Sequence, residues 1–367
     1  MNPDLLYQLS LCMTDNIGHV HAKILCDAFP SARDIFEAPA SELSRVEGIG
    51  KIRAQNIKKF RGFKKAEEEI AFMEKYRIKP LFLKDPDYPR RLLHCYDPPT
   101  LLFYKGPADL NASRIIAIVG SRNHTDYGRQ AVEKLVKEIS GDSILVVSGL
   151  AYGIDALAHK AALKNQLATV GVIGHGLDKI YPAEHTQLAR EMLLQGGLLT
   201  EFPSHTPPDK YHFPSRNRIV AGISDAVIVV ESGIKGGSMI TADLAAGYHR
   251  DVFAIPGRIN DAHSAGCNRL IQQNKAMLLT GKDQLVETMG WESIRPLHTN
   301  NREELLTELS PEEKQVYQLI ESGEIISMDD LSQTAGISAG AIASAILQLE
   351  MEHLIECLPG KLFRISR

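Results

Sequence analysis

The sequence has no apolar run near the ~18–20 residues needed to cross a bilayer, and no basic segment precedes an apolar stretch at its start. We therefore expect neither a membrane span nor a secretory signal. Its five cysteines form no C-x-x-C pair and are widely spaced: Cys12, Cys26, Cys95, Cys267 and Cys357. This spacing argues against a disulfide scaffold and a zinc site and predicts reduced thiols in a cytoplasmic protein without a metal or cofactor.

What is present is typical of a globular protein. The 367 residues, 44% hydrophobic and 23% charged, are enough for two or three domains of roughly 150 residues each. The net charge of −4 is unevenly distributed: residues 51–65 hold seven bases and no acid, whereas residues 303–358 hold twelve acids and one base. A polyanionic partner therefore suits the front of the chain better than its tail.

Residues 111–290 alternate continuous apolar runs with amphipathic helical stretches such as Tyr127–Ile139, Ile154–Asn165 and Thr186–Leu194. Buried apolar strands that alternate with helices indicate a parallel sheet covered on both faces. The predicted fold is α/β, an extended Rossmann-like, doubly wound and mostly parallel sheet. The expected strands are Ile115–Val119, Ile144–Ser148, Thr169–Ile173, Leu198–Glu201, Ala226–Val230, Val252–Ile255 and Ala276–Leu279.

Residues 1–74 are predicted to form a helical domain with a weak internal repeat. The segments 17–22 and 49–54 share the pattern Ile-Gly-x-hydrophobic-x-Ala, and the second copy has the tight turn of a helix-hairpin-helix, or SAM-like, motif. Its glycines allow close approach of a phosphate, and the helix start and nearby cations attract it. Accessory nucleic-acid contacts are therefore expected at Gly48, Gly50, Lys51 and Arg53, with packing or protein contact as the alternative use.

Three further segments follow from composition. Residues 75–110 are rich in proline and lack a clear period, which indicates an ordered connector, and residues 291–302 are expected to be a linker. Residues 303–367 show the helix pattern of a winged helix, with a helix over 338–351 capped by Ser338 and a Pro359-Gly360 hairpin turn. The exposed positions of that third helix carry no Lys or Arg, so protein contact is favoured over a purely structural role or DNA binding.

Glycines and hydroxyls gather where the expected strands end. Gly120, Ser121 and Arg122 follow the first strand, Gly149 follows the second, and Gly237 and Ser238 open the helix after the fifth. In open α/β sheets the carboxyl ends of the strands form the ligand-binding edge. Backbone amides and helix N-termini that converge there favour an anion, and Arg122 suits a two-pronged phosphate contact.

The segment 210–218 interleaves bases with aromatic residues and is interpreted as a loop. Lys210, Phe213, Arg216 and Arg218 fit single-stranded nucleic acid, because cations follow the backbone while rings stack on bases. The alternative is a lid or core segment in which Phe213 packs and the arginines pair with acids.

Enzymatic functions find less support. The first strand is not followed by the G-x-G-x-x-G of a dinucleotide site, and no residue is assigned a catalytic role. Asp155 is expected to cap its helix start, with His159 as a satisfied neighbour. Glu201, Glu231 and Asp243 follow expected strands and are candidate metal ligands. Asp243 is also the candidate acid of a phosphoribohydrolase-like, nucleotide-processing enzyme, which is the alternative function. An interaction scaffold that uses the acidic tail is a third.

The α/β motifs together resemble the DNA-processing protein A (DprA/Smf) family. The resemblance rests on Ile118–Arg122, Ser148–Asp155 with His159, Gly176–Asp178 with Tyr181-Pro182, Phe213-Pro214 with Arg216–Ile219, and Gly236–Ser238 with Thr241-Ala242. The flanking helix-hairpin-helix-like and winged-helix-like modules follow the fuller bacterial members.

This resemblance implies a cytoplasmic, non-enzymatic homodimer, joined through its α/β domain, that binds single-stranded DNA. It also implies that the protein loads a RecA-type recombinase onto incoming strands in natural transformation and DNA recombination. Arg122 corresponds to a DNA-binding arginine of the family, and Arg216 and Arg218 match its Arg-Asn-Arg motif.

Overall fold

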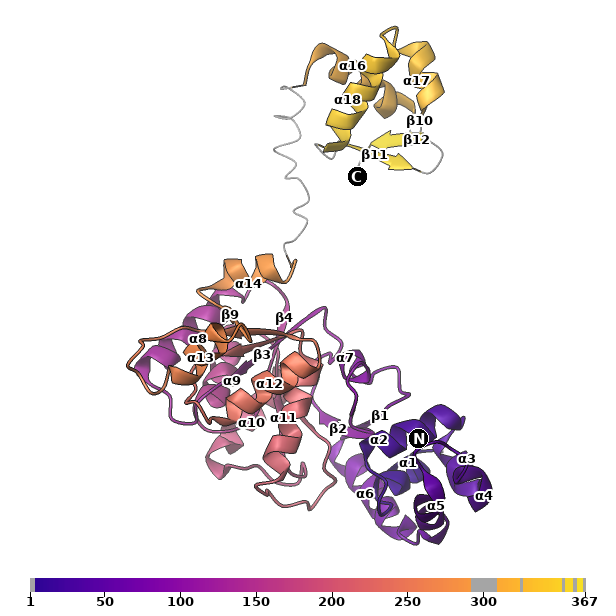
Figure 1. Cartoon of the computed structure of the whole chain (residues 1–367), viewed down its shortest axis with the longest axis vertical. Helices are drawn as coiled ribbons and strands as arrows, with labels where there is room; N and C mark the ends of the chain where they lie inside the picture. Colours follow the sequence, from indigo (N-terminus) through magenta and orange to yellow (C-terminus); the bar gives the residue numbers. More distant parts are fainter. Residues whose placement is uncertain (1–3, 292–308, 324–325, 352–353, 359–361, 366–367) are drawn as a thin grey trace. The chain divides into compact units, whose positions relative to one another are not determined.

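The computed structural model describes residues 4–291, 309–323, 326–351, 354–358 and 362–365. The chain folds as two units, Met1–Leu285 and Val286–Arg367 (Figure 1). The expected linker from residue 292 onward and the expected Pro359-Gly360 turn lie outside the described residues. Cys12, Cys26, Cys95 and Cys267 are free thiols, and none of the described helices is both long and apolar enough to cross a membrane.

A nine-stranded sheet forms the centre of the first unit, in the order β1-β2-β6-β5-β4-β3-β7-β8-β9. From β3 the chain builds outward to β6, then returns to place β7, β8 and β9 on the other side of β3, and all of these strands are parallel. This is the doubly wound, mostly parallel sheet that the sequence predicts, and all seven expected strands are present within two residues of their expected ends. They are β3 Arg114–Val119, β4 Ile144–Ser148, β5 Thr169–Val172, β6 Gly197–Thr200, β7 Ala226–Val229, β8 Asp251–Ala254 and β9 Met277–Leu278.

Helices cover both faces of this sheet. On one side α8 packs on α9 and α9 on α10, while α11 packs on α12 and both lie over strands of the other face. Amphipathic character produces this layering; α8, for example, buries Val132, Leu135 and Val136. The helices are α8 Asp126–Glu138, α9 Ile154–Lys164, the short η1 Ala183–His185, α10 Thr186–Gln195, α11 His212–Ile223, α12 Gly237–Gly247, α13 Ala265–Gln272 and α14 Lys282–Thr288.

The segment 75–110 is more than a connector. Its strands β1 Lys79–Phe82 and β2 Leu101–Lys105, separated by α7 Arg90–Leu93, extend the sheet by antiparallel pairing of β2 with β6. The period-2 signal is missing because residues 101–104 of β2 are buried on both faces, so they are apolar without alternation. The expected burial of Leu81, Phe82, Leu101, Leu102 and Phe103 is confirmed.

The helical module at the front has two hairpins that match the internal repeat. Ile17 and Ile49 are buried, as are Ala22 and Ala54, so the repeated positions are the ones that pack. Gly48 and Gly50 have positive φ angles of 84° and 64°, which confirms the expected tight turn. The helices are α1 Leu5–Cys12, α2 His19–Ala28, α3 Ala32–Glu37, α4 Ala40–Leu43, α5 Gly50–Lys59 and α6 Phe63–Tyr76.

The second unit has the helices and strands of a winged helix. They are α16 Pro311–Gly323, β10 Ile326–Ser327, α17 Met328–Thr334, α18 Ala339–Met351, β11 Ile355–Leu358 and β12 Leu362–Ile365, the strands forming a sheet in the order β10-β12-β11. Ser338 accepts a hydrogen bond from the Ala341 amide at 3.2 Å, as its predicted capping role requires. The exposed residues of α18 include Leu347, which is 60% exposed, and no Lys or Arg.

One partly buried ion pair fastens the segment 75–110 to the sheet. Asp225, just before β7, accepts from Arg91 Nε at 2.6 Å and Nη2 at 2.9 Å and from the Ile115 amide at 2.8 Å. We expect Asp225→Ala to lower the free energy of unfolding by about 2 kcal/mol, because it leaves a guanidinium and an amide without their acceptor. Urea unfolding measures this.

The control is Lys79→Ala, which breaks the Lys79–Asp87 pair, where both side chains are more than half exposed. It should cost under ~1 kcal/mol, because solvent screens exposed pairs. Equal losses for the two variants would contradict the role given to Asp225.

Candidate functional site

A cavity of about 270 Å³ opens where the strand order reverses, at the carboxyl ends of β3, β4 and β7. Seven of the ten predicted site residues line it. They are Gly120, Ser121, Arg122, Gly149, Arg216, Gly237 and Ser238. The remaining lining includes Asp155, Ser232, Gly233 and Thr241.

Two glycines of this wall are required by close packing. A Cβ on Gly120 would lie 2.6 Å from a side-chain carbon of Ile154, and one on Gly149 would collide with the side chains of Arg216 and Asp155. Helix α12 begins at the wall with Gly237 and Ser238, so its first amides present partial positive charge there. The Ser238 hydroxyl donates to Ser232 Oγ at 2.8 Å, which ties the two rims together.

Arg216 is the buried cation of the cavity, with 5% of its surface exposed. Its Nη1 donates to the Val172 carbonyl at the end of β5, its Nε has no hydrogen-bond partner, and it forms no ion pair with a described carboxylate. Burial lowers the pKa of Arg216, and burial raises the pKa of its neighbour Asp155. A buried charge with incomplete pairing is costly, so this wall favours an incoming anion.

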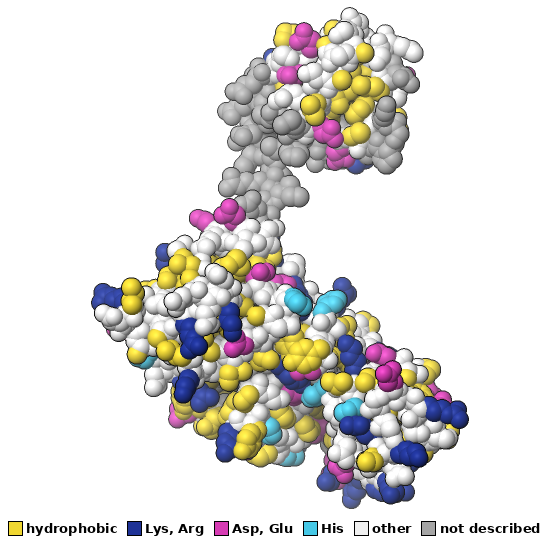
Figure 2. Space-filling model, in the orientation of Figure 1, with side chains coloured by type: hydrophobic (Ala, Val, Ile, Leu, Met, Phe, Trp, Pro, Cys, Tyr) yellow, Lys and Arg dark blue, Asp and Glu magenta, His cyan; other side chains and the backbone are white. Residues whose placement is uncertain are grey.

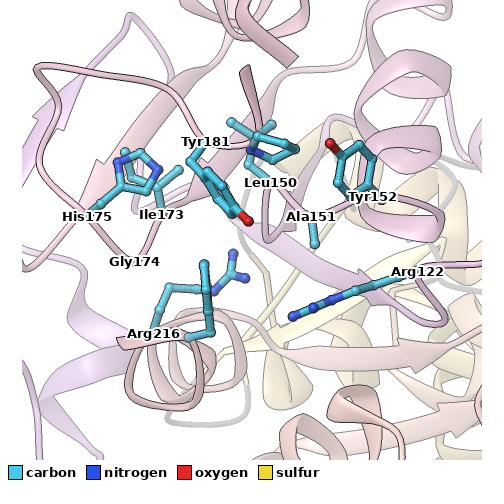
Figure 3. A pocket seen from close by; sticks show the side chains of 11 residues that line it. Arg122, Leu150, Ala151, Tyr152, Ile173, Gly174, His175, Tyr181 and Arg216 are labelled. Atoms are coloured by element: carbon cyan, nitrogen blue, oxygen red, sulfur yellow. The ribbon is translucent and has the colours of Figure 1, made fainter. Parts of the chain in front are cut away.

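Arg122 reaches into the same space from the opposite side (Figure 3). It is exposed, forms no hydrogen bond or ion pair with a described residue, and lies over the ring of Phe213, with its guanidinium carbon 5.9 Å from the ring centroid. Two guanidinium groups thus approach one cavity from β3 and α11, an arrangement that suits phosphate oxygens.

A smaller cavity of about 80 Å³ adjoins the first, sharing Arg122, Ala151 and Arg216. Rings dominate its lining, and Tyr181 lies 6.0 Å from Phe213 between ring centroids. His175 is fully buried there: its Nδ1 lies 2.9 Å from the Gly176 carbonyl, its Nε2 has no partner among the described residues, and burial lowers its pKa. The cavity therefore combines aromatic and aliphatic side chains with one neutral imidazole and the two shared arginines.

Tyr152, His175 and Tyr181 are not among the site residues predicted from the sequence, although all three line this cavity. They follow strands β4 and β5 by several residues. The signal that could have found them is therefore the shared strand-end edge rather than any local spacing.

The segment 210–218, which was predicted to be a loop, is helical from His212 onward, where α11 begins. Pro214 is compatible with this helix start, because its missing amide is one of the four that the first turn leaves unpaired anyway. Phe213 and Arg216, three residues apart, share the face that lines the cavities. Arg218 is displaced by about 200° from Arg216 around the helix and therefore faces elsewhere.

Arg218 and Lys210 line neither cavity. Arg218 is buried and pairs with Glu201 and the Asp97 carbonyl, as in the alternative interpretation of the arginines. Lys210 precedes α11 and lies 4.9 Å from the ring centroid of Tyr211. The structure thus does not bring these two together with the other eight.

Glu201, at the end of β6, holds α11 in place. Its carboxylate, 3% exposed, accepts from Ser215 at 2.9 Å, from His19 at 2.9 Å and from Arg218. Burial raises the pKa of Glu201, but the His19 hydrogen bond and the Arg218 charge outweigh it and leave the pKa below its usual value. The helix that carries Phe213 and Arg216 is therefore anchored to both the sheet and the helical module.

The other acids considered from the sequence have structural partners. Glu231 accepts from the amide and hydroxyl of Thr125 at the start of α8, and Asp243 pairs with Lys275 at 2.8 Å, outside the cavity lining. Within the described ranges no group of three His, Cys, Asp or Glu side chains could hold a metal ion.

The capping role predicted for Asp155 is wrong. Asp155 lies inside the first turn of α9 and accepts from the Ala151 amide at 3.3 Å, in the preceding loop. His159 is satisfied as expected: Nε2 donates to the Gly149 carbonyl at 2.6 Å, and Nδ1 lies 2.7 Å from Thr169 Oγ1.

The accessory residues lie in the helical module, away from both cavity linings. Gly48 and Gly50 form the turn before α5, and Lys51 is exposed. Arg53 donates to the carbonyls of Asn16 at 3.2 Å and Gly48 at 3.3 Å, so it joins the two hairpins.

Each of the three parts of the chain matches the model of a known protein family. Residues 79–290 match the family model of DNA recombination-mediator protein A, residues 301–361 match the DprA winged helix domain, and residues 10–61 match the SAM-like helix-hairpin-helix tandem. Protein Smf of Synechocystis sp. is 32% identical over 98% of both chains. DNA processing protein DprA of Bacillus subtilis is 43% identical over 60% of this chain and 75% of its own.

Two solved structures are similar as well. DNA processing protein A of Streptococcus pneumoniae superposes with a TM-score of 0.66 at 33% identity, over 77% of this chain and 97% of its own. DNA processing protein A of Helicobacter pylori, a structure described for its single-stranded DNA binding mode, gives a TM-score of 0.54 at 30% identity, over 59% and 97%.

The His159 contacts generate a pH prediction. Burial lowers the pKa of His159 from 6.5 to about 4, so the folded protein keeps it neutral while the unfolded chain takes up a proton below pH 6.5. Stability therefore falls with decreasing pH, and at pH 5 the wild type should have lost about 2 kcal/mol through this group relative to pH 7.5.

The comparison variant is His159→Gln, whose amide can keep both hydrogen bonds but does not titrate. Urea unfolding at the two pH values should show the wild type losing more stability than the variant. A difference between the two proteins that is the same at both pH values would contradict a neutral, buried His159.

Proposed function

The chain belongs to the DNA recombination-mediator protein A family, and we propose that it binds single-stranded DNA in the paired cavities and delivers the strand to a RecA-type recombinase. The observation that carries this proposal is the buried Arg216, which lies beside Asp155 with its Nε unbonded and opens toward Arg122 and a pocket lined by Tyr181 and Phe213. The described single-stranded DNA binding mode of the Helicobacter pylori relative supports it.

In this proposal the larger cavity takes a phosphate. Arg122 and Arg216 supply positive charge from two sides, and the first amides of α12 add the partial charge of a helix N-terminus. Glycine at 120 and 149 leaves room for Ile154, Arg216 and Asp155 to pack against these strand ends, which sets the position of Arg216 in the cavity wall. None of these contacts distinguishes one base sequence from another, so binding should be largely independent of sequence.

The smaller cavity takes a base. Phe213 and Tyr181 present ring faces, and stacking on an aromatic ring is open to every base but only when the strand is unpaired. Duplex DNA keeps its bases stacked on each other, so it can use the phosphate contacts alone. This is the physical basis for a preference for single strands.

We propose binding without chemical turnover. Asp155, the carboxyl group in the lining, is held by the Ala151 amide beside Arg216, and Asp243, the acid expected of a nucleotide-processing enzyme, pairs with Lys275 elsewhere. Incubation with nucleoside monophosphates should therefore release no free base; release would favour the phosphoribohydrolase-like alternative.

Delivery requires surfaces beyond the cavities. We propose that the protein is a homodimer joined through the α/β domain and that it acts in the cytoplasm on DNA taken up in transformation. The exposed face of α18 has no cation, so we assign the winged helix to protein contact, while the basic helical module, with Lys51 exposed, adds weaker attraction for DNA.

The central prediction concerns the two arginines. Arg122→Ala combined with Arg216→Ala should weaken binding of an oligothymidine at least about tenfold, because two phosphate contacts are lost. It should also flatten the dependence of affinity on salt concentration. Fluorescence anisotropy at several salt concentrations measures both effects.

The matched control is Arg129→Ala together with Arg269→Ala, two arginines that line neither cavity. This protein should bind as the wild type does. If instead the Arg122/Arg216 variant kept wild-type affinity and salt dependence, the cavity would not be the binding site.

A further prediction separates DNA binding from delivery. Leu347→Asp, on the exposed face of α18, should leave oligothymidine affinity unchanged because that face lacks cations. It should slow the assembly of a RecA-type recombinase on strands coated by this protein. Loss of DNA affinity would assign α18 to DNA instead.

A further inference from the structure

A second group of rings and cations lies where α6 meets the loop after β6. We call it the α6 ridge and define it as Phe72, Lys75, Tyr76, Lys105 and His205. The ring centroids of Phe72 and Tyr76 are 4.6 Å apart, and those of Phe72 and His205 are 5.8 Å apart. The Nζ atoms of Lys75 and Lys105 lie 5.2 Å and 6.0 Å from the Tyr76 ring centroid.

The ridge is open to solvent and positively charged. Tyr76 is 43% exposed and the His205 side chain 79% exposed. Neither Lys75 nor Lys105 forms an ion pair with a described residue. Glu74 lies on the opposite side of α6, about 200° from Tyr76, and Glu68 bounds the ridge one turn before Phe72. Several Lys and Arg side chains are also visible over the helical module in Figure 2.

Two shielded carboxylates build the turn that presents His205. Glu69, 6% exposed, accepts from the Ser204 amide at 3.0 Å and from its hydroxyl at 2.5 Å, and Asp178 accepts from the His205 amide at 2.8 Å. His205 has a φ of +64°, a left-handed conformation that a non-glycine residue adopts only when its surroundings enforce it. Glu69 and Asp178 are therefore engaged in holding the turn, whereas Glu68 and Glu74 are exposed at the border of the ridge and on the opposite side of α6.

The ridge is continuous with the proposed DNA site. Asp178 belongs to the same loop as Gly174, His175 and Tyr181, which line the smaller cavity. The Gly176 amide donates to the Thr206 carbonyl at 3.1 Å, so this loop and the His205 turn are joined directly. Lys179 lies between Tyr181 and the turn in sequence; its side chain is half-exposed, and its Nζ lies 3.9 Å from Asp178 Oδ2, so Asp178 partly neutralises this cation.

From this continuity we infer that the α6 ridge is a second binding section for single-stranded nucleic acid, taking the strand that leaves the smaller cavity past Tyr181. This inference rests on the proposed function and adds to it a part of the helical module distinct from the Gly48–Gly50 turn. Tyr76 and His205 stack on successive bases, while Lys75, Lys105 and Lys179 follow the phosphates, the combination used by proteins that bind single strands without sequence preference.

The test compares oligothymidines of two lengths, about 4 and about 15 nucleotides, because only the longer can extend beyond the cavities. The variant is Tyr76→Ala with Lys105→Ala, and the matched control is Tyr96→Ala with Lys164→Ala, which removes a more exposed tyrosine (67% against 43% for Tyr76) and a lysine elsewhere. We expect the ridge variant to lose about tenfold in affinity for the longer oligonucleotide only, and the control to lose none. Thermal unfolding checks that both variants are folded.

The outcomes separate the two proposals. Wild-type affinity of the ridge variant for the longer oligonucleotide would overturn the ridge while leaving the cavities as the binding site. An equal loss for both lengths would also overturn it, because the variant would then be acting through the cavities. Failure of the wild-type protein to bind either length would overturn the proposed function itself.

Discussion

A positively charged guanidinium that is buried with incomplete hydrogen bonding is the constraint on which the proposed site depends. Arg216 donates a hydrogen bond to the Val172 carbonyl. Position 149 is glycine because the side chains of Arg216 and Asp155 occupy the space that a Cβ would need there. Helix α11 carries Phe213 as well as Arg216, and the Phe213 ring lies against Arg122. An anion that enters this space supplies the stabilisation that water cannot give to the buried cation. Affinity for phosphate therefore depends on how the domain packs around Arg216.

Arg216 can be kept in this state because α11 is fastened on its other side. Glu201 gathers Ser215, Arg218 and His19, so that one carboxylate ties the helix to the end of β6 and to α2 of the helical module. The two arginines of the Arg-Asn-Arg motif therefore have different roles. One is left incompletely paired at the cavity, and the other is fully engaged in holding the helix that presents it.

Sequence alone was sufficient for the parallel sheet and for most of the cavity, since both follow from apolar strands and from polar residues at their carboxyl ends. It was insufficient for β1 and β2, where burial on both faces removes the alternation that identifies a strand. It also misplaced Arg218: the segment 210–218 was predicted to be a loop, and only the helical geometry of α11 shows that residues two apart face opposite ways. The ridge at α6 had no sequence signal, because Phe72, Lys105 and His205 come from three separate segments.

The antiparallel pairing of β2 with β6 has a mechanical consequence. Because β1 and β2 belong to the central sheet, and Phe82, Leu101 and Phe103 pack into the core of the helical module, module and sheet form one continuous solid without a hinge segment between them. The spacing between the cavities at the sheet edge and the surface of the helical module is therefore set by packed strands and a shared core rather than by a flexible connection.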